Sequence, residues 1–149
     1  MGIRMNTPRR YLFAGAIAAS LTAMTTNAFA ATQVDIELQL LMDISGSVDA
    51  TEFNLQKQGY ADAFRNVAVQ NSILDTSGGD LGKIAVQFIY WSGSTEQEVA
   101  IDWTEIASVQ DALDFADDIE ATTRPFDGLT APGSAINFAA PLFDTNDFD

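Results

Sequence analysis

Two spacings of apolar residues occur along this chain, and each predicts a different kind of element. Residues 34–42 start as an alternation and become continuously apolar, which is typical of a strand that enters a sheet and ends buried on both faces. Residues 83–91 are β-branched, aromatic and few enough to form a second core strand. Val99, Ile101 and Trp103 alternate with polar neighbours after a Ser-Gly-Ser turn, as in an antiparallel edge strand with one wet face.

Helical spacing is found between and after these strands. One stretch starts with a capping-box pattern at Asp49 and Glu52, and another starts with the same pattern at Ser108 and Asp111. Pro132 fits the first turn of a last helix. The apolar positions of the three helices are, in order, Phe53, Tyr60, Phe64 and Val67; Val109, Leu113, Ala116 and Ile119; and Ile136, Ala139, Ala140 and Phe143. The acids of the second helix are expected to face water, and these are Asp114, Asp117, Asp118 and Glu120.

The order of these elements predicts the fold class. Strand, helix, strand, edge strand, helix, helix is the first half of a doubly wound α/β domain, a partial Rossmann-like sheet with an antiparallel edge strand. The chain has 149 residues, of which 47% are hydrophobic, and this is enough for one compact core but too little for two complete domains. We therefore expect one α/β domain.

Composition removes several classes of function. The formal net charge is −14, so the chain repels a phosphate backbone, and nucleic acid is not an expected partner. There is no Cys and no His, which excludes thiolate nucleophiles, disulfides, zinc sites of the Cys/His type and imidazole acids or bases. Chemistry in this chain must use carboxylates, hydroxyls or a hard metal ion.

The amino-terminal segment has the pattern of a secretory signal peptide. An apolar run at residues 11–24 follows several arginines, and Ala28 and Ala30 place small residues at the two positions that a signal peptidase reads. The run is shorter than the ~20 apolar residues that a spanning helix needs, so no stable membrane anchor is expected after cleavage. We predict a signal peptide at residues 1–30 and a mature domain at residues 31–149.

The arginines of this segment bear on the export pathway and on the net charge of the mature domain. Arg9 and Arg10 precede Tyr11, Leu12 and Phe13 in the order that the twin-arginine export pathway uses. Either export route leads to a periplasmic or secreted protein. Loss of Arg4, Arg9 and Arg10 and of no acid takes the net charge from −14 to −17, because −14 − 3 = −17. The mature domain is then expected to attract cations strongly.

One motif carries the candidate chemistry. Asp43, Ser45 and Ser47 lie where the first strand ends and a helix begins, which is where open α/β sheets bind ligands. Their spacing of two brings three oxygen-bearing side chains toward one point if the loop curls, and Gly46 is expected to allow the curl. Oxygen ligands with few carboxylates suit Mg²⁺ or Mn²⁺. The same residue types are also common in turns and helix caps, so the motif alone leaves both interpretations open.

The Asp43-x-Ser45-x-Ser47 motif resembles the opening signature of the metal-ion-dependent adhesion site (MIDAS) of von Willebrand factor A (VWA) domains. The resemblance implies that both serines bind the metal directly, that the aspartate acts mostly through water, and that a threonine from a later loop completes the set. Thr130 looks like that threonine, although it could also be a simple helix N-cap. The implied metal is Mg²⁺, with Mn²⁺ or Ca²⁺ as alternatives. The family's closing aspartate has no counterpart here.

A wider resemblance covers almost all of the predicted mature chain. It is to an uncharacterised family of exported bacterial VWA-like proteins, and it rests on residues 41–52, 58–65, 87–93, 103–104, 124–126 and 128–139. In that family the chain continues past the last helix into another strand, so the resemblance implies a C-terminally truncated domain. A truncated domain would leave the first strand with one uncovered edge, and an uncovered edge favours self-association.

The resemblance favours a binding module, not an enzyme. In such a module the metal accepts a carboxylate from a protein or other ligand as its remaining ligand. A metal-dependent phosphoester hydrolase with Asp43 at the strand end is the alternative, but the second acid that such enzymes place two residues on is replaced by Ser45. A triad hydrolase would lack its His. A non-functional remnant of the family is the third possibility.

Overall fold

The core of the protein is a mixed sheet of three strands. The computed structural model describes residues 30–149, so the predicted signal peptide, apart from Ala30, lies outside the described residues. The strands are β1 (Ile36–Asp43), β2 (Ile84–Trp91) and β3 (Gln97–Ile106), in the order β1-β2-β3. β1 runs parallel to β2, and β3 runs antiparallel to it. The predicted α/β class and the antiparallel third strand are therefore confirmed.

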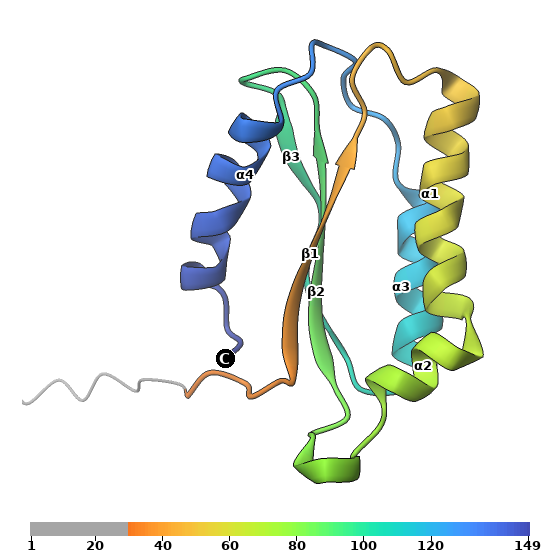
Figure 1. Ribbon diagram of the computed structural model, residues 1–149, viewed down its shortest axis with the longest axis vertical. Helices are drawn as coiled ribbons and strands as arrows, with labels where there is room; N and C mark the ends of the chain where they lie inside the picture. Colours follow the sequence, from red (N-terminus) through yellow and green to blue (C-terminus); the bar gives the residue numbers. More distant parts are fainter. Residues whose placement is uncertain (1–29) are drawn as a thin grey trace, which may run out of the picture.

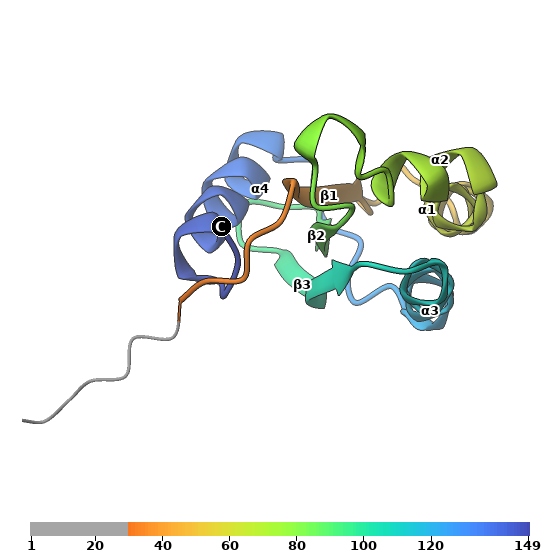
Figure 2. The same ribbon diagram turned by 90° about the horizontal axis from the view of Figure 1, so that it is seen from below.

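Helices cover both faces of this sheet. α1 (Ala50–Arg65) and α3 (Val109–Ala121) pack side by side on one face, and α4 (Pro132–Ala139) lies on the other (Figures 1 and 2). The remaining pieces are short, namely α2 (Val67–Ile73) and the 3₁₀ turns η1 (Ser77–Gly79) and η2 (Ala140–Thr145). This arrangement of helices on both faces of a mixed sheet is the α/β class that the sequence predicts. No helix in residues 30–149 has the length and apolarity needed to cross a membrane.

β2 is the centre of the core because it has a strand on each side and helices on both faces. Every residue from Ile84 to Tyr90 is buried. Phe88 and Tyr90 pack edge to face at 5.2 Å between ring centroids, and Phe64 of α1 meets Phe115 of α3 at 4.8 Å. Burial of each such side chain contributes about 1.5–3 kcal/mol relative to exposure. The tight core fixes the end of the sheet from which the loops extend.

α1 starts as predicted but ends earlier. The Asp49 carboxylate accepts from the backbone N–H groups of Thr51 and Glu52, and the Glu52 carboxylate accepts from the Asp49 N–H at 2.9 Å, so the capping box is confirmed. Asn66 then adopts an extended conformation, and its side chain caps α2 by accepting from the Ala68 N–H. Val67 therefore begins a new helix and is 66% exposed, so its predicted place in the apolar stripe of α1 is wrong.

The predicted stripe of α3 is partly wrong. The helix buries Ala112, Phe115, Ala116 and Ile119, whereas Val109 is 47% exposed. Val109 is the first residue of the helix, and the buried residues of α3 begin at Ala112. The predicted box is also only half formed: the Ser108 hydroxyl accepts from the Asp111 N–H, but the Asp111 carboxylate accepts from the N–H of Ala107, one residue before the cap.

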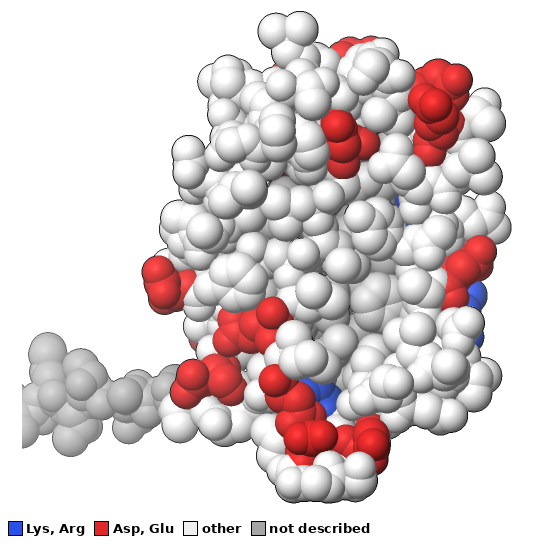
Figure 3. Space-filling view, in the orientation of Figure 1, with Lys and Arg blue, Asp and Glu red and all other residues white. Residues whose placement is uncertain are grey.

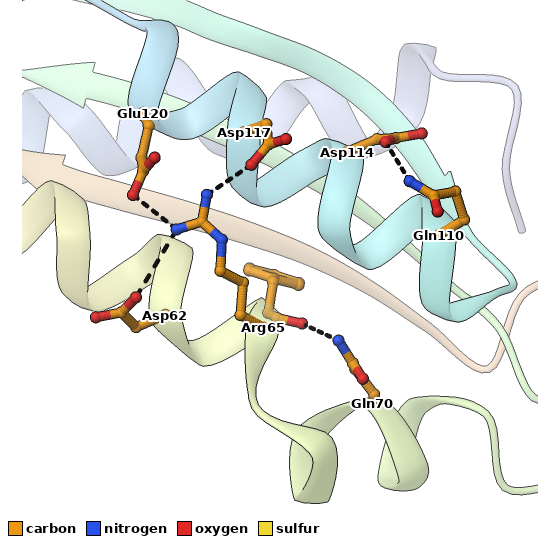
Figure 4. Close-up of polar contacts among 8 residues, drawn as sticks. Asp62, Arg65, Gln70, Gln110, Asp114, Asp117 and Glu120 are labelled. Atoms are coloured by element: carbon orange, nitrogen blue, oxygen red, sulfur yellow. Dashed lines mark hydrogen bonds and ion pairs between the residues drawn. The ribbon is translucent and has the colours of Figure 1, made fainter.

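An ion cluster joins α1 to α3 (Figure 4). Arg65 donates to the carboxylates of Asp117 and Glu120, both at 2.6 Å, and Asp62 lies 3.8 Å away. The hydrogen bond from Arg65 lowers the pKa of Glu120, and the two acids in turn raise the pKa of Arg65. Two of the acids expected only to face water thus also pair with Arg65. Because these side chains remain substantially exposed, their net contribution to stability is modest.

α4 is shorter than the apolar pattern predicts. Pro132 opens it in the first turn, as predicted, but the α-helix ends at Ala139. Pro141 follows, and its missing N–H and bulky ring disfavour further α-helical turns, so the chain continues as the 3₁₀ turn η2. Ala135 and Ala139 are buried, whereas Ile136 is 60% exposed, Phe143 is 40% exposed and Ala140 is exposed as well. Of the predicted apolar side, only Ala139 is therefore confirmed.

Candidate metal centre

The candidate site lies where three connections meet at one end of the sheet (Figure 1). We call residues 44–48, between β1 and α1, the serine loop. The other two connections are the β2–β3 turn at residues 92–96 and the segment at residues 122–131 that leads from α3 to α4. The serine loop follows the carboxyl end of β1 and the β2–β3 turn follows the carboxyl end of β2, where Asp43 is the register partner of Trp91. The third connection bonds to both of them through Gly128 and Ala131. This is the position at which α/β sheets bind ligands.

Asp43 organises the serine loop. Its Oδ1 accepts from the Ser45 N–H at 2.8 Å, and this bond turns the chain directly after the strand. The hydroxyl oxygens of Ser45 and Ser47 then lie 3.4 Å apart. Ser45 is only 1% exposed, whereas Ser47 is exposed. The structure thus brings together the three side chains that the motif predicts, with one hydroxyl buried and the other open to an incoming ligand.

Gly46 is required for a different reason from the one the sequence suggests. The described glycines with positive φ are Gly78, Gly79 and Gly82, so Gly46 does not need the left-handed region for the loop to curl. Its N–H donates to the Gly128 carbonyl at 2.8 Å, and a Cβ at Gly46 would lie 2.6 Å from the Asp127 carbonyl oxygen. Gly46 therefore permits a close approach of two backbones, and this contact joins the serine loop to the segment that carries Thr130.

Thr130 is held on both sides by backbone bonds. Gly128 bonds to the serine loop as just described, and the Ala131 N–H donates to the Ser92 carbonyl at 2.8 Å. Ala131, not Thr130, occupies the N-cap of α4, and it makes no side-chain capping bond. The alternative that Thr130 is a simple N-cap is therefore wrong. The Thr130 residue is exposed. Convergence of its hydroxyl with the two serines on one ion stays a prediction.

Arg124 is a residue of this region that the motif does not identify. Its guanidinium donates to the carbonyl oxygens of Ile44 at 2.7 Å, Ser45 at 2.9 Å and Val48 at 2.9 Å, and also to that of Phe126 at 3.2 Å. The same group lies 5.7 Å from the ring centroid of Phe53. The planar donors of an arginine suit several acceptors held at fixed angles. Arg124 thus fixes the carbonyl side of the serine loop. In the sequence, Arg124 is a lone cation in a helix break and belongs to one of the segments that carry the wider resemblance, but neither signal predicts this role.

Glu96 is a second residue that the motif does not identify. Its carboxylate accepts from the Ser92 hydroxyl at 2.6 Å and from the Gly93 N–H at 3.0 Å, and it lies directly against Gly128. A side chain at Gly128 has no room because the Glu96 carboxylate occupies its place. Glu96 therefore closes the β2–β3 turn and keeps the third connection close to it. The sequence signal is weak, since an acid after a Ser-Gly-Ser turn is common.

The ligand set is poor in carboxylates. Within residues 30–149, no three Asp, Glu, His or Cys side chains gather into a group that could hold a metal ion. An ion at the serine loop would depend on hydroxyl oxygens together with the single carboxylate of Asp43. Such a set fits a small hard cation that keeps several waters, and it does not fit a soft metal.

Comparisons with known proteins identify one family and two similar solved structures. Residues 33–149 match the family described as "Protein of unknown function (DUF1194)". Two solved structures are from the type V pili tip protein Mfa5 of Porphyromonas gingivalis. The three N-terminal domains match at 14% identity and a TM-score of 0.44, over 76% of this chain and 18% of that one. The vWF domain matches at 11% identity and a TM-score of 0.42, over 80% and 35%. The chain thus spans only a minor part of either. No curated protein matches it by sequence.

Proposed function

The chain belongs to the family described as "Protein of unknown function (DUF1194)", and from that premise we propose that it is a metal-dependent binding module. The serine loop holds a divalent cation through Asp43, Ser45 and Ser47, and Thr130 is the further ligand. The observation that carries the proposal is the pair of serine hydroxyls, 3.4 Å apart on a backbone fixed by Asp43, Gly128 and Arg124.

The loop geometry supports a hard cation. In an octahedral Mg²⁺ shell with ligands at about 2.0–2.1 Å, neighbouring oxygens are about 2.9 Å apart. The hydroxyls of Ser45 and Ser47 need to approach each other by about half an ångström to reach that spacing, and the exposed Ser47 leaves room for such a shift. Mg²⁺ is the first choice, with Mn²⁺ or Ca²⁺ as alternatives.

The partner that we propose is a protein or other ligand that offers a carboxylate. With one protein carboxylate in the set, a divalent ion keeps a net positive charge and open coordination positions. The described cations already have protein partners: Lys57 donates to backbone carbonyls, Lys83 pairs with Glu105, and Arg65 and Arg124 are held as described above. The metal would then be the adaptor that joins this acidic domain to an acidic partner.

Electrostatics favour this class of partner over nucleic acid. At a formal charge of −14, the domain repels anions at long range, and salt screens that repulsion beyond about 10 Å. Association with a carboxylate ligand would therefore need the divalent ion and would be lost with a chelator. We further propose that the module acts in the periplasm or outside the cell, because the amino-terminal segment has the pattern of a signal peptide.

The test is a titration of Mg²⁺ and Mn²⁺ into the purified chain, read by the fluorescence of Trp91, which is the register partner of Asp43. Asp43→Asn keeps an oxygen that can accept from the Ser45 N–H but removes the charge, so we expect metal affinity to fall by about 10–100-fold with little change in folding. Ser47→Ala, at an exposed position, should weaken binding similarly.

The matched control is Asp118→Asn, which removes one exposed acid from α3, away from the serine loop. Like Asp43→Asn, it removes one negative charge, and we expect it to leave metal affinity unchanged. Equal titrations for the Asp43 and Asp118 variants would reject the site, because they would show diffuse binding to an acidic surface.

A further inference from the structure

Arg124 gives all of its hydrogen bonds to backbone carbonyls. Its guanidinium makes four, and three of them reach Ile44, Ser45 and Val48 of the serine loop. No carboxylate of residues 30–149 forms an ion pair with it. Acids are nevertheless spread over the molecular face drawn in Figure 3, and the formal charge of the chain is −14. The carbonyls of one loop, and not a charge partner, therefore hold this side chain in place.

These bonds take carbonyl oxygens away from any metal ion in the loop. The serine loop has five carbonyls, and Arg124 occupies three of them. The Ser45 carbonyl also accepts from the Val48 N–H at 2.8 Å, so both of its lone pairs have donors. An oxygen that already faces a guanidinium is a poor ligand for a second cation. The ligands that the loop can offer are thus weighted toward the hydroxyls of Ser45 and Ser47, which lie 3.4 Å apart.

The same guanidinium also holds the segment that carries Thr130. It donates to the Phe126 carbonyl at 3.2 Å and lies 5.7 Å from the ring centroid of Phe53 in α1. The bond from the Gly46 N–H to the Gly128 carbonyl, at 2.8 Å, is a second tie between the two connections. The serine loop therefore cannot widen around a larger ion without breaking contacts to its neighbour.

Mg²⁺ and Ca²⁺ make different demands on such a loop. Ca²⁺ takes about six to eight oxygens at about 2.3–2.6 Å, backbone carbonyls among them, in a flexible shell. Mg²⁺ takes an octahedral shell at about 2.0–2.1 Å, keeps several waters and needs few protein ligands. A narrow loop that withholds most of its carbonyls suits the smaller ion.

We propose, on the basis of the metal site proposed above, that Arg124 is a positioning residue that makes the serine loop selective for Mg²⁺ over Ca²⁺. It acts through the backbone, because it occupies carbonyls that Ca²⁺ could use and keeps the loop from widening. Its own positive charge opposes the binding of any cation, so its contribution is geometry and not attraction.

Competition against Mn²⁺ measures this selectivity. Free Mn²⁺ gives an electron paramagnetic resonance signal that is lost on binding, so Mg²⁺ or Ca²⁺ that displaces bound Mn²⁺ restores the signal. Sites that Asp43→Asn leaves unchanged lie elsewhere on the acidic surface and are subtracted. For the wild-type chain we expect Mg²⁺ to compete at least about tenfold more strongly than Ca²⁺. This arm of the experiment needs no variant at Arg124.

Arg124→Lys keeps the charge but loses the planar donors. We expect Mn²⁺ affinity to fall by about tenfold, as for other residues that orient metal ligands, and the preference for Mg²⁺ over Ca²⁺ to fall toward one. Partial unfolding lowers the number of sites but leaves the ratio of the two competitors unchanged, so this ratio separates positioning from stability. Arg65→Lys is the matched control in the ion cluster between α1 and α3, and we expect wild-type affinity and ratio.

Arg124→Gln separates charge from geometry. Loss of a nearby positive charge by itself would raise the affinity for all three ions alike and leave the ratio of Mg²⁺ to Ca²⁺ unchanged. We expect instead that this variant also loses the preference for Mg²⁺, because glutamine cannot reach the three carbonyls together.

Two results would overturn the role of Arg124. One is a wild-type chain on which Ca²⁺ competes as strongly as Mg²⁺, and the other is an Arg124→Lys variant that keeps the wild-type ratio. A different result, Mn²⁺ binding to the wild-type chain that does not depend on Asp43, would reject the metal site itself and this role with it.

Discussion

At the loop end of the sheet, three connections are tied together by backbone hydrogen bonds and by Arg124, whereas along the outer edge of β1 apolar side chains and backbone groups face an open groove. The loop end is polar, and backbone and arginine hydrogen bonds of 2.7–2.9 Å hold its connections together. The groove is apolar and offers no fixed polar geometry. A fixed polar loop suits a small hard ion, whereas the apolar groove offers such an ion no ligands.

The largest expected effect contrasts two residues of β1. Met42 is 1% exposed and Leu38 is 37% exposed, although both belong to the same strand and differ mainly in what covers them. Met42→Ala leaves a cavity in the core and should lower the free energy of unfolding by about 2–4 kcal/mol. Leu38→Ala should cost less than about 1 kcal/mol because its site is already open to water. Urea unfolding of both variants measures this, and equal losses would mean that something covers the groove in solution.

Removal of Arg124 should open the loop end. Arg124→Ala leaves the carbonyls of Ile44, Ser45 and Val48 without this donor, and we expect a loss of about 2–4 kcal/mol in the free energy of unfolding. Arg124→Lys keeps the charge but not the planar donors, so it should recover only a minor part of the loss. The same urea titrations serve as the measurement. If Arg124→Lys were as stable as wild type, the positive charge of residue 124, and not the fixed geometry of its donors, would stabilise the loop end.

Two glycine variants separate close packing from chain entropy. Gly46→Ala places a Cβ 2.6 Å from the Asp127 carbonyl oxygen, and the backbone shift should cost about 1–3 kcal/mol. Gly59→Ala lies within α1 with no neighbour within 4 Å, and it should stabilise the protein by up to about 1 kcal/mol. Thermal unfolding of both variants shows whether each substitution raises or lowers the unfolding temperature. A neutral Gly46→Ala would show that the two connections do not touch in solution.

The smallest effect concerns the ion cluster between α1 and α3, which belongs to neither region. Arg65 lowers the pKa of Glu120 in the folded state, so the contribution of this pair is present above the unfolded pKa of Glu120 and is lost as pH falls through its lower folded pKa. Glu120→Gln should therefore be less stable than wild type near neutral pH and equally stable in acid. Urea midpoints across pH measure the gap, and a gap that persists in acid would assign it to packing.

The sequence predicts the elements well where one local signal decides them. The capping box at Asp49 and the antiparallel direction of β3 each depend on neighbouring residues, and the structure confirms them. The predicted alternation in β3 is wrong, because register shifts interrupt the strand, so that Ile101 packs against the core and Trp103 against Phe143. The predictions for Val67, Val109 and Ile136 are wrong, because apolar spacing does not tell where a helix ends or which turn reaches the core. Such boundaries are set by caps and by tertiary packing.

The candidate site divides in the same way. Asp43, Ser45 and Ser47 belong to one short motif, so their proximity could be read from spacing alone. Arg124 donates to backbone carbonyls about eighty positions away, and no spacing rule links such residues. Glu96 bonds locally to Ser92 and Gly93, but its contact with Gly128 exists only in the folded chain. Gly46 is a third case. The sequence predicts that a glycine there lets the loop curl, but the reason that a glycine is required is the nearby carbonyl of Asp127, which only the folded chain places beside it.

The most direct test is the broadening of backbone NMR signals by substoichiometric Mn²⁺ in the isotopically labelled chain. A paramagnetic ion broadens the signals of nuclei close to it, so the affected amides locate the metal. We predict that the signals of Ser45, Ser47 and Thr130 are lost first and together, and that Asp43→Asn strongly reduces this loss at the same Mn²⁺ concentration. Loss of signals from the acids of α3 before those of the serine loop, or from the serine loop without Thr130, would contradict a metal centre built from both connections.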